Sequence, residues 1–382
     1  MEIATYFGHE PRRKQHEIVT MIREFVECES PSDHPPSVNR FIDLLSERVR
    51  DIAKVKTFDG GSFGKHLRVE FNLPGSKKQG QILALGHSDT VWTLGTLRTM
   101  PFREQQGRLW GPGVLDMKAG LVFFIFAMRA LRDLDVPILR KVTMQVNSDE
   151  EVGSESSRAL TEDAARSSNA VLVLEPGTGL EGKLKTARKG VGDYLVTVRG
   201  IASHAGVDFA NGANAIVEMA RQLERIAGFT QLDRGVTVSP GVIQGGTRSN
   251  VVPAECRAEV DIRAPRDRDR VYLEKKFASL KSFDKRCTVE VTGGLNRPPM
   301  ERSAGVRKLY RTAEKLAAEL GVTLQESSTG GGSDGNFTAA LGIPTLDGLG
   351  AVGEGAHAPN ESILINRIAD RTALLAKLVA AL

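Results

Sequence analysis

The chain contains little cysteine and has no apolar run long enough to cross a bilayer. Cysteine occurs at three of the 382 positions, far apart and without the paired spacing of a metal site or a disulfide framework: Cys28, Cys256 and Cys287. We interpret them as reduced structural thiols of a cytoplasmic protein. The most apolar run, residues 119–128, is too short to span a membrane and is typical of a buried helix, so we expect no membrane partner.

A secretory leader is also missing from the start of this sequence. Residues 1–15 are polar and lack the apolar segment of a signal peptide. This favours a cytoplasmic location, and export stays open if the natural chain begins upstream.

Aromatic residues are scarce at 5%, and 51 Lys and Arg nearly balance 47 Asp and Glu, for a net charge of +4. There is no dense basic stripe with interleaved aromatics, so we expect no nucleic-acid partner. The small positive excess suits an enzyme that attracts anionic substrates, and a solvated surface explains it equally well. A charged fraction of 26% and a hydrophobic fraction of 41% are ordinary for a globular protein, and 382 residues suffice for two domains.

Metal-seeking side chains follow apolar segments at five places along the chain. They are His87, Asp116, Glu151, Glu175 and His357. Each one alone is better explained as a helix cap, a turn residue or an ordinary histidine. Together they supply the imidazole and carboxylate ligands of a two-zinc site, in which one carboxylate bridges both ions. The carboxyl ends of buried strands are suitable mounts, because α/β proteins bind ligands at that edge of the sheet.

The first part of the chain alternates between strand and helix patterns. We expect strands at 66–72, 81–86, 142–147 and 170–175, and helices at 12–27, 38–51, 117–133 and 155–166, with a proline-rich break at 30–36. This alternation predicts an α/β fold with a mostly parallel sheet. After residue 298 we expect a helix at 304–320, a glycine loop, a strand at 344–347 and a C-terminal helix from 363.

Residues 191–298 follow a different pattern. We expect strands at 193–199, 235–243, 254–263 and 287–292, with helices at 214–228 and 268–281. The β-α-β-β-α-β order is ferredoxin-like, which predicts an inserted second domain. The first domain is then discontinuous, with residues 1–190 and 299–382.

The motifs around these residues resemble the aminoacylase/carboxypeptidase family of zinc peptidases, and most closely its folate-cleaving bacterial glutamate carboxypeptidases. The matching segments, in unbroken order, are HSDT at 87–90, GPGVLDMKAG at 111–120, DEEVGS at 149–154, EP at 175–176, SHAG at 203–206 and GGGSDG at 330–335. The resemblance implies that the discontinuous domain is a dizinc catalytic domain. It also implies that the inserted domain is a lid through which a homodimer forms.

The resemblance further implies a role for each ligand. His87, Asp116 and Glu175 would hold one zinc, and Asp116, Glu151 and His357 the other, giving two Zn²⁺ per subunit with Co²⁺ or Mn²⁺ as possible substitutes. Glu150 would be the general base. Asp89, two residues after His87, fits an acceptor for the imidazole N–H, and is otherwise a turn residue. Met117 stands where the family often has a second acid, which weakens the expectation of the family's cis peptide at that point.

Five further residues are candidates for contacting the substrate. By resemblance, His204 stabilises the oxyanion, delivered from the neighbouring subunit, and Asn250 contacts the substrate; alone they read as a surface histidine and a loop amide. Lys183 and Arg297 match residues that bind substrate carboxylates, a task suited to the fork of arginine. The glycine run around Gly331 lacks the lysine of a phosphate-binding loop. Its free N–H groups could meet a carboxylate, or it is a plain turn.

These assignments predict a metallocarboxypeptidase. It would hydrolyse the amide bond of a small N-acyl- or peptidyl-amino acid and release a C-terminal amino acid, glutamate or aspartate. The alternatives are an N-acyl-amino-acid deacylase of the aminoacylase, deacetylase or desuccinylase type, and a non-catalytic zinc-binding homologue. The presence of Glu150 argues against the last, because a binding protein has no use for a positioned base.

Overall fold

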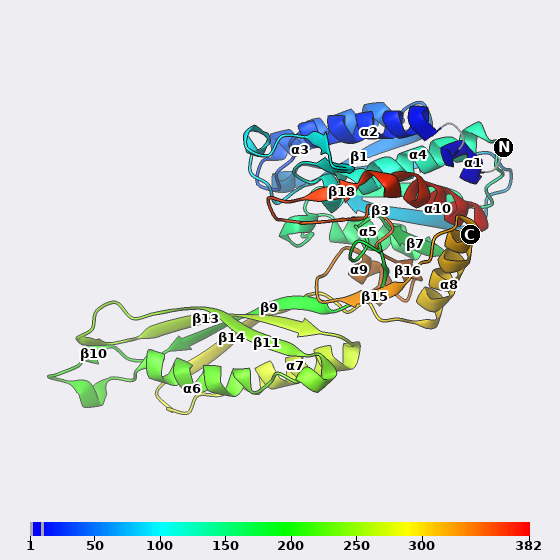
Figure 1. Ribbon diagram of the computed structural model, residues 1–382. Helices are drawn as coiled ribbons and strands as arrows, with labels where there is room; N and C mark the ends of the chain where they lie inside the picture. Colours follow the sequence, from blue (N-terminus) through cyan, green and yellow to red (C-terminus); the bar gives the residue numbers. More distant parts are fainter. Residues whose placement is uncertain (1–2, 9–10) are drawn as a thin grey trace. The chain divides into compact units, whose positions relative to one another are not determined.

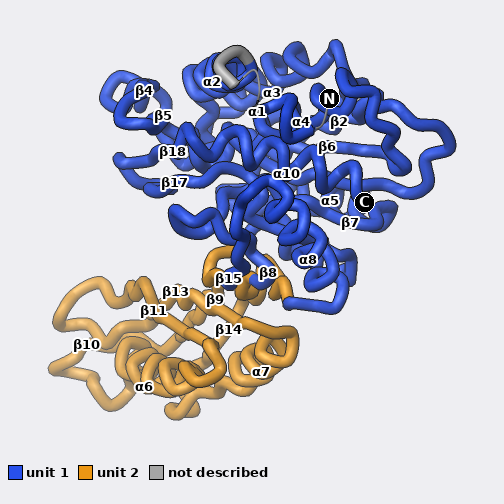
Figure 2. Tube along the Cα trace, turned by 45° about the vertical axis from the view of Figure 1, so that its right-hand side comes forward, with its two compact units in different colours: residues 1–187, 302–328, 333–382 blue, residues 188–301, 329–332 orange. Residues whose placement is uncertain are grey.

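The structure, a computed structural model, describes residues 3–8 and 11–382. Part of the polar start at residues 1–15 therefore lies outside the described residues. The chain divides into two compact units (Figure 2): unit 1 contains residues 1–187, 302–328 and 333–382, and unit 2 contains residues 188–301 and 329–332. The expected domain boundaries, 190/191 and 298/299, lie within three residues of the main divisions. The glycine segment 329–332 belongs to unit 2, which the sequence does not predict.

Unit 1 contains most of the helices and strands (Figure 1). In chain order they are α1 (Ile3–Gly8), α2 (Pro11–Glu27), α3 (Pro35–Val49), β1 (Ala53–Asp59), β2 (Lys65–Phe71), β3 (Gln81–His87), β4 (Arg103–Gln105), β5 (Arg108–Trp110), α4 (Ala119–Asp133), β6 (Lys141–Asn147), α5 (Arg158–Arg166), β7 (Ala170–Val173), β8 (Leu184–Arg188), α8 (Ala304–Glu319), β15 (Glu326–Thr329), α9 (Gly335–Ala340), β16 (Thr345–Leu346), β17 (Gly353–Glu354), β18 (Ser362–Leu364) and α10 (Ile368–Ala381). Strands β8 and β15 pair with each other and run up to the division between the units.

Short helical turns connect these elements. They are η1 (Gly61–Phe63), η2 (Thr96–Arg98), η3 (Val114–Lys118), η4 (Glu150–Val152) and η7 (Ile365–Arg367) in unit 1, and η5 (Phe209–Asn211) and η6 (Leu232–Arg234) in unit 2. Two of them, η3 and η4, carry candidate site residues.

The main sheet of unit 1 has the strand order β1-β2-β6-β3-β7-β16. Strands β6, β3, β7 and β16 pair in parallel, and only β2 runs against its neighbours. The prediction of a mostly parallel α/β sheet is therefore confirmed. In the β3–β6 register His87 lies opposite Asn147. The two strands thus end together, and the segments after them emerge from the same edge of the sheet.

Alternate residues of the strands pack on opposite faces of this sheet. On β3, Ile82 and Ala84 join the large core formed with α2, α3, α4 and α10, whereas Leu83 and Leu85 pack with α5. Because both faces are covered by apolar helices, the sheet is held rigidly and its edge is a stable mount for ligands.

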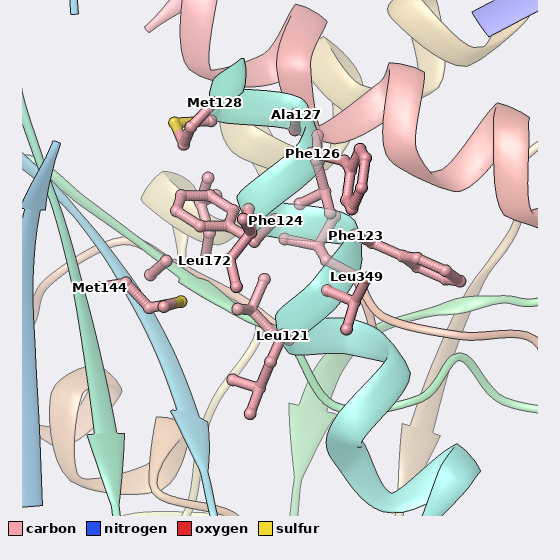
Figure 3. Packing of buried hydrophobic residues seen from close by; sticks show 14 of the residues in the cluster. Leu121, Phe123, Phe124, Phe126, Ala127, Met128, Met144, Leu172 and Leu349 are labelled. Carbon is pink, nitrogen blue, oxygen red and sulfur yellow. The ribbon is translucent and has the colours of Figure 1, made fainter. Parts of the chain in front are cut away.

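Helix α4 is the centre of the larger core (Figure 3). Every residue from Ala119 to Met128 is buried, as expected for a helix enclosed on all sides. Phe124 faces the sheet beside Met144 and Leu172, and its ring makes an edge contact with Phe71 at 5.7 Å between centroids. Burial of one such side chain stabilises the fold by about 1.5–3 kcal/mol.

The start of α4 differs from the expected helix at 117–133. The preceding residues form η3, in which Asp116 and Met117 have non-helical backbone angles, and the Asp116–Met117 peptide is cis. The presence of Met117 in place of a second acid thus does not remove the cis peptide.

Unit 2 consists of an antiparallel sheet with two helices. Its elements are β9 (Gly190–Arg199), β10 (Ser203–His204), α6 (Ala215–Ala227), β11 (Thr237–Gly245), β12 (Val251–Val252), β13 (Glu255–Ala264), α7 (Asp267–Ala278) and β14 (Thr288–Arg297). The sheet order is β11-β13-β9-β14, and the main elements follow the expected β-α-β-β-α-β order. Its core includes Tyr194 stacked on Phe277 at 3.8 Å between ring centroids.

Across residues 3–8 and 11–382, none of the helices combines the length and the apolar character that a bilayer crossing requires.

Candidate metal centre

Two histidines and three carboxylates of unit 1 meet around Asp116. Asp116 Oδ1 lies 3.1 Å from His87 Nε2, and Asp116 Oδ2 lies 3.3 Å from His357 Nε2. Glu175 Oε1 lies 3.5 Å from His87 Nε2, and Glu151 Oε1 lies 3.2 Å from His357 Nε2. Asp116 therefore presents one oxygen to each histidine, and each histidine has one further carboxylate of its own. This arrangement has the form of two neighbouring ligand sets that share one carboxylate.

The sheet explains how residues so distant in sequence come together. His87 is the last residue of β3, the Glu150–Glu151 pair opens η4 after β6, and Glu175 follows β7. Because these three strands are parallel neighbours, their carboxyl ends lie at one edge. Asp116 arrives from η3, and His357, with φ of 61°, from the loop between β17 and β18.

Asp89 lies directly behind this cluster. Its backbone oxygen is 2.9 Å from His87 Nδ1, and its carboxylate Oδ1 is 3.5 Å away. A proton on Nδ1 would leave Nε2 with its lone pair towards the ligand site. The carboxylate also accepts the backbone N–H groups of Glu150 and Glu151, each at 3.2 Å, and the hydroxyl of Ser32 at 2.8 Å. Asp89 thus fixes the histidine of β3 and the glutamate pair after β6 in one frame.

The carboxylates of the cluster favour positive charge on the groups between them. Burial opposes protonation of His87, but hydrogen bonds with Asp116, Asp89 and Glu175 raise its pKa well above the ordinary value. The adjacent carboxylates of Asp116 and Glu151 raise the pKa of His357 to about 10. Burial works to raise the pKa of Asp116, yet the two imidazoles hold it well below its ordinary value.

The donor set fits divalent metal ions. Imidazole nitrogens and carboxylate oxygens are the zinc ligands of catalytic sites. Ligand atoms of two overlapping groups, His87 with Glu150 and Glu175 and His87 with Asp116 and Glu151, lie within 4.8 Å of one another. Glu151 Oε1 is buried and accepts no hydrogen bond, although His357 Nε2 is 3.2 Å away. Two ligand atoms that face each other in this way are suited to a shared cation.

Glu361 is a further residue at this centre, and the sequence does not single it out. Its carboxylate is fully buried and accepts backbone N–H groups of Gly113, Leu115 and Asp116. An acid four residues after His357 looks like an exposed loop residue in the sequence. Only the fold shows that it lies behind Asp116.

Lys183 belongs to the same unit as the five ligand candidates. It closes a hairpin with Thr178 through two backbone hydrogen bonds of 2.9 and 3.0 Å, a few residues after Glu175. Its side chain is half-buried.

His204 and Asn250 are both exposed and belong to unit 2. His204 Nδ1 accepts the N–H groups of Gly206 and Val207, each at 3.1 Å, so the ring proton resides on Nε2. The backbone oxygen of Asn250 accepts the N–H of Ala205 at 3.0 Å. The two residues therefore lie on adjacent segments. Because Nδ1 of His204 accepts the two backbone N–H groups, its exposed Nε2–H can donate a hydrogen bond of the kind that stabilises an oxyanion.

Arg297 and Gly331 also lie in unit 2. Arg297 is buried, with 6% of its surface exposed, and packs so closely on Gly332 that a Cβ there would lie 2.6 Å from Arg297 Cδ. Arginine side chains are mostly solvated, but Arg188 is 4% exposed and donates to the carbonyls of Gly331 at 3.1 Å and Gly332 at 2.8 Å. The carbonyls of the glycine run accept hydrogen bonds from this guanidinium. The two segments are far apart in the chain, so the sequence does not reveal the interaction.

Comparison with known proteins agrees with this geometry. The chain matches the sequence model described as peptidase family M20/M25/M40 over residues 83–381. It is 31% identical to carboxypeptidase G2 of Pseudomonas sp. (strain RS-16) over 304 residues, covering 78% of this chain and 73% of that protein. It is 29% identical to succinyl-diaminopimelate desuccinylase of Cereibacter sphaeroides over 314 residues, 74% of this chain and 78% of that protein.

Solved structures share the fold. The crystal structure of the aminopeptidase PepT of Bacillus cereus superposes with a TM-score of 0.78 at 22% identity, covering 96% of this chain and 98% of that one. The family match extends over all five ligand candidates, from His87 to His357. The chain therefore belongs to peptidase family M20/M25/M40 and is a metallohydrolase.

Proposed function

We propose that this protein is a two-metal carboxypeptidase that cleaves an N-acyl- or peptidyl-amino acid and releases a C-terminal glutamate or aspartate. The observation that carries the proposal is the placement of Asp116 between His87 and His357, with the Glu150–Glu151 pair at the same edge of the sheet. The inferred partner is a small-molecule substrate. The inferred cofactor is two Zn²⁺ per subunit, with Co²⁺ or Mn²⁺ as substitutes.

His87, Asp116 and Glu175 would hold one ion, and Asp116, Glu151 and His357 the other. When bound, such ions polarise the amide carbonyl and lower the pKa of water towards about 7. Glu150 is adjacent to Glu151 and is assigned to neither ion, although its carboxylate lies close to His87 and Glu175. It accepts a proton from the attacking water and passes it to the leaving amine, which is the work of a general base and then a general acid.

His204 has a separate task. Its Nε2–H donates to the oxygen that becomes negatively charged in the tetrahedral intermediate. The orientation is supported by the two N–H groups that occupy Nδ1. Asn250, on the neighbouring segment, contacts the same substrate.

Specificity is assigned to the cationic residues. Arg297 binds the α-carboxylate that every such substrate has, and Lys183 binds the second carboxylate of a glutamate or aspartate. The likeness to carboxypeptidase G2 supports a carboxypeptidase, whereas the likeness to the desuccinylase supports the alternative, an N-acyl-amino-acid deacylase. Activity on acyl-glutamate, acyl-leucine, acyl-alanine and succinyl-amine substrates, with the free amino acid quantified, separates the two. Equal rates on the three acyl-amino acids would reject the acidic preference.

The proposal includes a homodimer formed through unit 2, whose role is that of a lid. Strand β11 is at the edge of its sheet, with Val242 44% and Ile243 53% exposed. Apolar edge strands are ready to pair with another chain. We also propose a cytoplasmic location, because the composition is that of an ordinary globular protein and the three cysteines are free rather than paired in disulfides.

A further inference from the structure

The carboxylate of Glu361 accepts four hydrogen bonds behind the metal centre. Oε1 accepts the N–H groups of Leu115 at 2.8 Å and Asp116 at 3.1 Å. Oε2 accepts the N–H of Gly113 at 2.8 Å and the indole Nε1–H of Trp92 at 2.7 Å. Glu361 has no exposed surface, so these donors replace all of its hydration.

These hydrogen bonds stabilise a stretch of backbone that does not have helical geometry. Asp116 has φ of −115° and ψ of 94°, outside the helical region, within the short turn η3. Its N–H therefore needs an acceptor other than the carbonyl of a regular helix, and Glu361 supplies it. The same turn presents one Asp116 oxygen to each histidine. The orientation of the shared ligand thus depends on an acceptor behind it.

Glu361 also connects this turn to the segment that carries His357. After His357 the chain folds into two consecutive turns, with Ala358 N–H bound to the Gly355 carbonyl and Glu361 N–H bound to the Ala358 carbonyl, each at 2.9 Å. The main-chain oxygen of Glu361 accepts the N–H of Gly111 at 3.4 Å. Glu361 therefore fixes Asp116 and His357 relative to each other through its side chain and its main chain.

We propose that Glu361 is a positioning residue that sets the metal affinity of this centre by holding the Asp116 turn against the His357 segment. The inference rests on the metal centre of the proposed function. Glutamine is nearly the same size but cannot replace it, because an amide has one acceptor oxygen and would direct its NH₂ group at two N–H donors.

Unit 2 offers a matched control in Glu218. Its carboxylate is 1% exposed and accepts backbone N–H groups of Phe283 at 2.9 Å and Asp284 at 3.0 Å, and the side-chain amide of Gln222 at 2.7 Å. It is the same kind of buried acceptor for loop N–H groups, in the unit that holds none of the five ligand candidates. Glu218→Gln therefore reproduces the loss of a buried carboxylate without touching the ligands.

The experiment titrates Zn²⁺ into the metal-free full-length protein against a chelator of known affinity. We expect Glu361→Gln to weaken zinc binding by about 10- to 100-fold, the usual effect of losing a group that orients ligands. Glu218→Gln should stay within about twofold of the wild type, because the Glu218 carboxylate accepts from Gln222, Phe283 and Asp284 and from none of the ligand candidates. Both variants should lower Tm. A folded Glu361→Gln protein with wild-type zinc affinity would overturn the inference, whereas a wild type that binds no zinc would overturn the proposed function itself.

If Glu361→Gln is not recovered folded, Glu361→Asp replaces it. Aspartate keeps the charge but withdraws the carboxylate by one methylene, so zinc binding should weaken by a smaller factor, and unchanged affinity would again overturn the inference.

Trp92 gives an independent signal, because the chain has 2 tryptophans and Trp110→Phe leaves Trp92 alone. In that background Glu361→Gln should shift Trp92 emission and Glu218→Gln should not. Unaltered emission in the Glu361 variant would contradict the contact.

Discussion

His87 in unit 1 and His204 in unit 2 are held in opposite ways. His87 is 2% exposed, ends a central strand, and is fixed from behind by Asp89. His204 is exposed on a two-residue strand, and the backbone N–H groups of Gly206 and Val207 orient its ring. The contrast shows that the ligand candidate His87 is fixed by the sheet edge, whereas the ring of His204, the proposed oxyanion donor, is oriented but not enclosed. Such a donor is accessible to a substrate or to a second subunit.

The largest effect is expected at Glu150. Glu150→Gln should retain metal but lose about 10²–10⁴-fold in kcat, since it removes the proton acceptor and leaves every ligand. Glu151→Gln should lower metal content as well, because it removes the proposed carboxylate ligand beside His357. Turnover and metal content are measured on the same samples. Loss of metal in Glu150→Gln with retention in Glu151→Gln would show that the two roles are reversed.

The next effect concerns exchange between subunits. Inactive His204→Ala and inactive Glu150→Ala proteins are mixed under conditions that allow subunits to exchange. If His204 acts in the partner's site, each mixed dimer has one intact site, half of the dimers are mixed, and about a quarter of wild-type activity returns. Each variant exchanged with itself is the control. Continued inactivity, with exchange verified by two different tags, would place His204 in its own subunit's site or outside catalysis.

A smaller effect is expected from the cationic residues. Arg297→Ala should lower kcat/KM by about 10- to 100-fold on all acyl-amino acids, because a charge-assisted hydrogen bond to a carboxylate contributes about 1.5–3 kcal/mol. Lys183→Ala should lower it mainly for acyl-glutamate and spare acyl-alanine. Arg297 is buried, so Arg297→Lys and a Tm measurement control for loss of folding. Identical losses on both substrates in the Lys183 variant would argue against its role.

The sequence locates the five ligand candidates because their signal is local. Each follows an apolar strand or a glycine turn, and parallel strands bring such ends together. The residues that hold the ligands are less visible. Glu361 and Arg188 act on backbone groups of segments far away in the chain, and a contact of that kind leaves no pattern in either segment.

Element boundaries show the same limit. The sequence predicts a break at 30–36, yet α3 begins at Pro35, because proline is tolerated in the first turn of a helix and His34 caps it by accepting from Ser37 N–H. The C-terminal helix is expected from residue 363 and begins at Ile368, since residues 362–364 are taken by β18. Tertiary pairing decides these ends.

The central claim is a hydrolase that needs two metal ions per chain, with Asp116 shared between them. Elemental analysis of fully active protein, followed by chelation and stepwise return of Zn²⁺ with activity assayed at each step, tests it most directly. We expect two ions per chain in active protein, no activity after complete removal, and full recovery only when the second equivalent is restored. Full activity with one metal ion or none per chain would contradict the account.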